Sequence, residues 1–186
     1  MVGAVLTQNA AWINVARAIE NLRAKRLLDP HRILKAPPAT LAACLRPSGY
    51  FNVKAKRLRA LCRWLVEAGG EAQCRRRDTE SLRRALLAVH GVGPETADDI
   101  LLYAFARPVF VVDAYTRRIF SRLGLTEANA GYETLRSCFE QALARRVPWY
   151  NEYHALIVRH GKEICRPKPR CPECCLSKIC PFPGKR

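Results

Sequence analysis

Four cysteines near the end of the chain constrain its fold more than any other feature of the sequence. Cys165, Cys171, Cys174 and Cys180 follow one another as Cys-x5-Cys-x2-Cys-x5-Cys, and three prolines lie among them. Thiolates are soft ligands, and four of them at this spacing can converge on one centre. The segment is therefore expected to fold around a metal, and both a [4Fe–4S] cluster and a structural zinc ion suit these ligands.

The charge of the chain indicates the kind of partner. Among 186 residues, 32 Lys and Arg face 16 Asp and Glu, which gives a formal net charge of +16. The length suffices for one domain or two small lobes with a real core. Such an excess of positive charge indicates a polyanion, most simply nucleic acid. A surface that is charged only for solubility is the alternative.

The distribution of apolar residues and cysteines indicates in which cellular compartment the protein is expected. The chain has no apolar run long enough for a membrane helix, and its start lacks the basic segment and apolar core of a signal peptide. We therefore expect a cytoplasmic protein without a membrane partner, in which clustered thiols bind metal more often than they form disulfides.

Hydrophobic periodicity predicts an almost wholly helical chain. Apolar residues recur at helical spacing over 11–24, 54–68, 80–89, 95–106, 114–123, 132–145 and 149–160. Short breaks rich in Pro and Gly separate these segments. The apolar run 109–112 is too short to carry a sheet, so the expected fold class is all-α.

The stretch 90–98, His-Gly-Val-Gly-Pro-Glu-Thr-Ala-Asp, joins two apolar helical segments. Gly91 and Gly93 allow a tight turn whose N–H groups point outward, and Pro94 suits the first turn of the next helix. Such N–H groups bind an anion, here a DNA phosphate. An ordinary helix–helix turn is the alternative, but the flanking apolar helices favour a helix-hairpin-helix over 82–106.

Asp113 follows the apolar run 109–112 and opens a basic helix. As an N-cap it would be held ionised by helix N–H groups. A cap with no further role is the simplest interpretation. Beside a DNA-binding hairpin, the same carboxylate can also stabilise a sugar cation or orient a water molecule against it.

Taken together, the hairpin, Asp113 and the cysteine tail resemble the endonuclease III superfamily of DNA glycosylases. The segments 6–9 (Leu-Thr-Gln-Asn), 49–55 (Gly-Tyr-Phe-Asn-Val-Lys-Ala) and 160–165 (His-Gly-Lys-Glu-Ile-Cys) strengthen the likeness, which covers essentially the whole chain. The resemblance implies an all-α, two-lobed helix-hairpin-helix glycosylase fold with a C-terminal iron–sulfur loop that holds its cluster through four cysteines.

The resemblance also implies an arrangement of the lobes. One helical lobe would span 10–124 and carry the hairpin, a second would combine 1–9 with 125–164, and 165–180 would form the cluster loop. The groove between the lobes would receive a nucleotide flipped out of double-stranded DNA. The protein is expected to act as a monomer on duplexes that contain a damaged base.

Site residues follow from the resemblance position by position. Asp113 would be the catalytic carboxylate, Gln8 would fill the space left by the extruded base, and Lys54 would lie near the damaged strand. The hairpin contacts to DNA would come from Gly91, Val92, Gly93, Glu95 and Thr96. A [4Fe–4S] cluster would be bound by Cys165, Cys171, Cys174 and Cys180, although Cys175 stands next to Cys174 and is a second candidate for that ligand.

One departure from the family's pattern concerns the chemistry. Bifunctional members place a lysine nucleophile two residues after the second glycine of the hairpin, where this chain has Glu95. A carboxylate cannot form a Schiff base with the sugar, so lyase activity by that route is not expected. The chain is most similar to the monofunctional bacterial 3-methyladenine glycosylases, which act on alkylated purines. An alkylated, cationic base leaves readily and stacks on aromatic rings, for which Trp12 is the candidate unless it packs between helices.

The sequence therefore predicts a DNA repair glycosylase that hydrolyses the N-glycosidic bond of an alkylated purine. A bifunctional or mismatch-directed member of the same superfamily is the first alternative. A non-catalytic iron–sulfur DNA-binding protein is the second, and a zinc module attached to an unrelated helical domain is a distant third.

Overall fold

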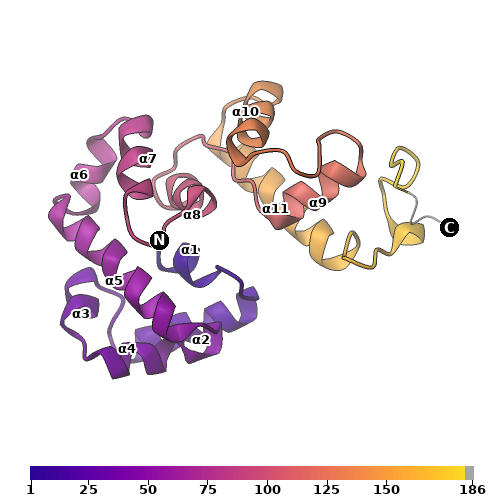
Figure 1. Ribbon diagram of the computed structural model, residues 1–186. Coiled ribbons are helices and arrows are strands. Elements are labelled where there is room, and N and C mark those ends of the chain that lie inside the picture. Colours follow the sequence, from indigo (N-terminus) through magenta and orange to yellow (C-terminus); the bar gives the residue numbers. More distant parts are fainter. Residues whose placement is uncertain (183–186) are drawn as a thin grey trace. The chain divides into compact units, whose positions relative to one another are not determined.

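The computed structural model describes residues 1–182, and the regular elements of this part of the chain are all helical (Figure 1). The predicted all-α class is confirmed. The chain divides into two compact units, Met1–Phe105 and Ala106–Arg186. None of the described helices has the length and apolar content needed to cross a bilayer.

The first unit is built around the long helix α5 (Phe51–Glu67), which packs against α1, α3, α4 and α6. Its buried face carries Leu58 and Leu61, as the helical spacing predicts. Asp29 and Asp78 cap α3 and α7 by accepting from the backbone N–H groups of Arg32 and Ser81. The other elements are α1 (Val2–Leu6), α2 (Trp12–Ala24), α3 (Pro30–Lys35), α4 (Pro38–Leu45), η1 (Arg46–Ser48), α6 (Gly70–Arg76), α7 (Thr79–Leu87) and α8 (Pro94–Asp99).

The second unit consists of α9 (Ala114–Arg122), α10 (Tyr132–Ala142), α11 (Val147–Glu163) and the short η3 (Cys171–Glu173). Helix α9 packs along α11, and Gly161 permits the close approach, because a Cβ atom there would lie 2.5 Å from Cδ1 of Tyr115. Phe110 stacks on Phe139 with ring centroids 4.3 Å apart and anchors the buried extended run 109–112 in this core.

The two units differ from the predicted lobes in two places. Residues 1–9 were expected to join the second lobe, but α1 packs against α2, α5 and α8 of the first unit. The first lobe was expected to extend to 124, but α9 packs along α11 and therefore belongs to the second unit. Both differences arise from packing partners that are remote in sequence.

Candidate functional site

The hairpin between α7 and α8 lies in the first unit. Gly91 has φ +83°, and a Cβ atom on it would lie 2.2 Å from Cγ of Arg57, so both its backbone and its surroundings require glycine. Gly93 has an extended backbone and open space where a Cβ atom would be. Gly93, Pro94 and Glu95 are exposed together at the start of α8.

Other predicted hairpin contacts are turned inward. The side chains of Val92 and Thr96 are buried, and the N–H of Val92 donates to the carbonyl oxygen of Val89. Any contact that Thr96 makes with DNA must therefore come from its backbone. The exposed positions around Gly93 are the ones that the structure leaves open to a phosphate.

Gln8 is occupied in holding the hairpin. Its Nε2 donates to Gly91 O at 3.0 Å and to Thr96 Oγ1 at 2.9 Å, and its Oε1 accepts from Arg57 at 2.5 Å. These partners hold the Gln8 side chain at the hairpin in this DNA-free structure, and that Gln8 fills the space left by an extruded base stays a prediction. The neighbouring Asn9, which the sequence analysis missed, is exposed and has φ +52°. Asn9 follows α1 in the chain, and its side-chain amide is open to solvent.

Lys54 is also engaged in internal contacts. Its side chain is buried, and Nζ donates to Leu6 O at 2.8 Å and to Ser48 O at 2.6 Å. Burial, and then the nearby charge of Arg57, lower the pKa of Lys54. The ammonium group thus joins α1 and η1 to α5, and the predicted place of Lys54 near the damaged strand stays a prediction. Tyr50, which has φ +46° and stands before α5, is among the exposed residues of this stretch.

Trp12 begins α2 and is 55% exposed. An added Cβ atom on Gly3 would lie 3.6 Å from its ring, so the ring rests beside α1. A tryptophan that only packs between helices would be covered. The exposure therefore favours the interpretation of Trp12 as a surface for stacking.

Asp113 lies in the second unit and is the N-cap of α9, as the sequence predicts. One carboxylate oxygen, Oδ1, accepts from Thr116 N at 2.7 Å and from Thr116 Oγ1 at 2.8 Å, and the residue is buried. Burial would raise its pKa, but His154 and the hydrogen bonds from Thr116 outweigh burial, so the pKa of Asp113 is lowered from its ordinary value. The site therefore holds a buried, ionised carboxylate.

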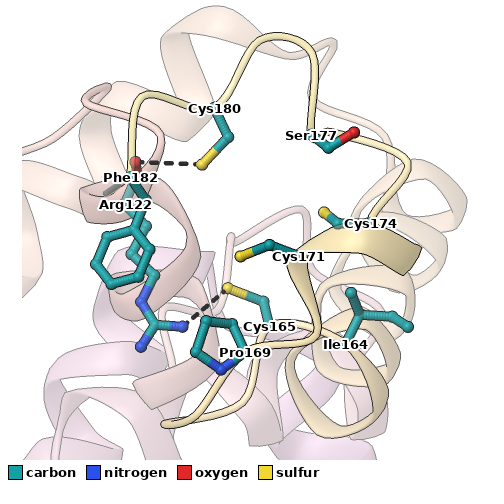
Figure 2. Close-up of a pocket in the computed structure, with 9 residues that line it drawn as sticks. All are labelled: Arg122, Ile164, Cys165, Pro169, Cys171, Cys174, Ser177, Cys180 and Phe182. Atoms are coloured by element: carbon teal, nitrogen blue, oxygen red, sulfur yellow. Dashed lines mark hydrogen bonds between the residues drawn. The ribbon is translucent and has the colours of Figure 1, made fainter. Parts of the chain in front are cut away.

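The four cysteines of the tail line one cavity, and Figure 2 shows their sulfur atoms facing a common space. Cys175 is exposed and does not line the cavity, whereas its neighbour Cys174 does. The remaining lining residues are Arg122, Ile164, Pro169, Ser177 and Phe182.

The walls of this cavity suit a group held by thiolates. The guanidinium of Arg122 lies 3.3 Å from Cys165 Sγ and supplies positive charge beside it. His160 Nε2 lies 3.5 Å from Cys174 Sγ. Within residues 1–182, no three His, Cys, Asp or Glu side chains gather as the ligands of a single metal ion would. The thiols thus surround a space and do not meet at one point.

Comparisons with known proteins agree with these features. A model of the HhH-GPD superfamily of base excision DNA repair proteins matches residues 2–145. A protein of Methanocaldococcus jannaschii named as a DNA repair glycosylase is 47% identical over 183 residues, which cover 97% of this chain and 83% of that one. Endonuclease III of Thermotoga maritima is 32% identical over 100% of this chain and 83% of its own.

Solved structures of DNA glycosylases also resemble this chain. The 3-methyladenine DNA glycosylase MagIII of H. pylori, bound to 1,N6-ethenoadenine, has a TM-score of 0.74 at 31% identity and matches 87% of this chain and 83% of its own. Endonuclease III in a non-covalent complex with DNA has a TM-score of 0.84 over 99% of this chain and 82% of its own, at 24% identity, and indicates the fold alone.

Proposed function

Because the chain belongs to the HhH-GPD superfamily of base excision DNA repair proteins and is a DNA repair glycosylase, we propose that it is monofunctional and acts on alkylated purines. The products would be a free base and an intact strand with an abasic site. The observation that carries the proposal is Asp113, a buried carboxylate that its surroundings keep ionised.

Asp113 would act on the sugar. When the N-glycosidic bond breaks, its electron pair leaves with the base and positive charge develops on the sugar ring. A fixed negative charge nearby stabilises that state more than the ground state. A water molecule then adds to the anomeric carbon and gives its proton to the carboxylate. An alkylated purine is already cationic and leaves as a neutral base, so the site needs no strong acid.

Two features of the first unit support the absence of lyase activity and the class of base. Glu95 stands exposed on the hairpin where the related bifunctional enzymes have lysine, and it has no amine to attack the sugar. Trp12 and Tyr50 expose aromatic rings that would stack on a cationic base. The likeness to MagIII, whose structure is bound to 1,N6-ethenoadenine, supports a modified purine as the substrate.

The hairpin would bind the DNA backbone, with Gly93 leaving room for a phosphate and Asn9 available to the space that the flipped nucleotide vacates. These contacts do not depend on the base sequence, as a repair enzyme requires. We propose that one copy of the chain suffices for this interaction.

The tail would bind a [4Fe–4S] cluster through Cys165, Cys171, Cys174 and Cys180. The support is that four soft ligands surround a cavity, since a cluster of several irons needs more widely spaced ligands than a single zinc ion does. When bound, the cluster would fasten the end of the chain to α9 and α11. Protein purified without oxygen should be yellow-brown and contain iron, and a colourless protein with stoichiometric zinc would contradict the assignment.

The experiment that tests the function is a panel of duplexes, each with one modified purine or one mismatch, in which base release and strand cleavage are scored separately. We expect release of alkylated purines, no cleavage until hot alkali is added, and no protein–DNA adduct with borohydride. Cleavage with a borohydride adduct would establish a bifunctional enzyme. Release from mismatches alone would establish a mismatch glycosylase, and binding without release a non-catalytic protein.

A further inference from the structure

The second carboxylate oxygen of Asp113 faces a histidine from another helix. His154 lies on α11, is buried, and places Nε2 3.7 Å from Asp113 Oδ2. This distance exceeds a hydrogen bond but is within reach of an ion pair when the imidazole is protonated. Oδ1 is already saturated by Thr116, so the two oxygens have different environments.

The cations of α9 are directed elsewhere. Arg117 donates to Ala130 O at 2.6 Å, Arg118 donates to the carbonyl oxygens of Gly161 and Cys165, both at 2.8 Å, and Arg122 donates to those of Arg166 and Pro167. Each guanidinium is therefore bound to backbone carbonyl groups. Within the part of the chain that the structure describes, the ionisable partner of Asp113 is His154.

The two residues stand on rigid elements. Asp113 is fixed as the cap of α9, and His154 lies in the interior of α11, which packs closely on α9. A carboxylate that stabilises a transition state must keep both its direction and its charge, and neighbouring groups provide both.

We propose that His154 is the positioning residue of Asp113: it holds Oδ2 in its direction and favours the ionised carboxylate. The proposal rests on the catalytic role proposed for Asp113. His154 acts only through that carboxylate and does not touch the DNA. It also accounts for a buried histidine on α11 that nothing else in the proposed reaction uses.

The electrostatics of the site agree with this role. After burial, which opposes ionisation, the interaction with His154 is the largest influence on the pKa of Asp113, and it lowers that pKa. Activity needs the ionised form, so it falls as pH drops through the pKa of Asp113. Removing the imidazole raises this pKa, and the acid limb of the pH–rate profile should move to higher pH.

The experiment compares His154→Leu and His154→Gln under single-turnover conditions, using the lesion duplex from which the wild type releases the base fastest. We expect His154→Leu to slow base release by about 10–100-fold, as the loss of a residue that orients a reactive group does. DNA affinity should stay unchanged and the acid limb should move to higher pH. His154→Gln keeps an N–H donor and should recover part of the rate. His31→Leu, at an exposed histidine of α3, is the matched control.

A double-mutant cycle separates this role from a structural one. In the Asp113→Asn background, His154→Leu should slow base release only slightly further, because the charge of its partner is already gone. The inference would be overturned if His154→Leu slowed base release by the same factor in both backgrounds, or if His154→Leu alone released the base at the wild-type rate. If Asp113→Asn is itself fully active, the proposed catalytic role has failed instead. Should the leucine variant not fold, His154→Gln carries the test through its pH profile, and an unshifted acid limb would refute the proposal.

Discussion

The two glycines of the hairpin have different roles although they stand two positions apart. Gly91 adopts a left-handed backbone and lies against Arg57, so the folded hairpin itself requires it. Gly93 caps α8 with an extended backbone that any residue adopts, and nothing lies near its missing side chain. The space beside Gly93 is therefore open.

Serine substitutions separate the two roles. Gly91→Ser should lower the free energy of unfolding by about 1–3 kcal/mol, because it strains the backbone and displaces Arg57. Gly93→Ser, a good N-cap, should leave the stability unchanged within about 0.5 kcal/mol and weaken binding to duplexes of any sequence alike. Urea unfolding and fluorescence anisotropy measure the two effects. Equal destabilisation by both variants would refute the distinction.

The sequence predicted the local contacts of some candidate site residues and not those of others, for a physical reason. The capping of α9 by Asp113 was predictable because its partner, Thr116, is only three residues away. The internal hydrogen bonds of Gln8 and Lys54 were not predictable because their partners, such as Gly91 O and Leu6 O, are remote in sequence. Side-chain chemistry suggests a DNA contact in both cases, and only the fold shows that the groups are used internally. His154 was missed for the same reason.

At the scale of elements, one buried ion pair joins the two helices of the hairpin. Arg83 on α7 and Asp98 on α8 form a two-pronged contact of 2.7 and 3.1 Å, with side chains 8% and 0% exposed. Such a pair contributes little net stability over an apolar pair, but removing one partner takes this two-pronged contact away from a buried charge.

Arg83→Met should therefore lower the free energy of unfolding by about 3–5 kcal/mol, and the double variant Arg83→Met/Asp98→Leu should recover most of the loss. Arg159→Met is the control, because the ion pair of Arg159 with Glu163 is exposed and should matter by less than about 1 kcal/mol. Denaturant unfolding checks all three variants. A loss in Arg83→Met no larger than in the control would show that the pair does not secure the hairpin.

Helices with several turns of regular pattern were predicted closely, and short ones were not. The expected helix 54–68 is α5, Phe51–Glu67. Helices α3, α4 and α6 were missed, because six to eight residues contain too few periods for a pattern to be seen. The expected helix 95–106 begins as α8 but continues as a π-helical segment, Ile100–Ala104, in which Phe105 N donates to Ile100 O.

At the scale of the whole molecule, the net charge of +16 is the dominant property, but not all of it is available to DNA. Lys54 is buried, and the arginines of α9 bind backbone carbonyl groups. The number of phosphates that the protein neutralises should therefore be clearly smaller than its formal charge.

The salt dependence of DNA affinity tests this expectation. Each neutralised phosphate contributes a slope of about −0.9 to log affinity against log salt, because condensed counterions are released. We expect a steep slope that corresponds to fewer phosphates than the formal charge would allow, measured by titration of an undamaged duplex at several salt concentrations. An affinity that hardly responds to salt would contradict electrostatic binding.

The central claim is that the ionised carboxylate of Asp113 carries the reaction, and Asp113→Asn tests it most directly. Asparagine keeps the shape and the capping ability of the residue but removes its charge. Single-turnover base release from the preferred lesion duplex should fall by about 10²–10³-fold, as it does when one electrostatic stabiliser of a transition state is lost. Affinity for that duplex should be retained or increase, because a negative charge has been removed. Base release at the wild-type rate by Asp113→Asn would contradict the account.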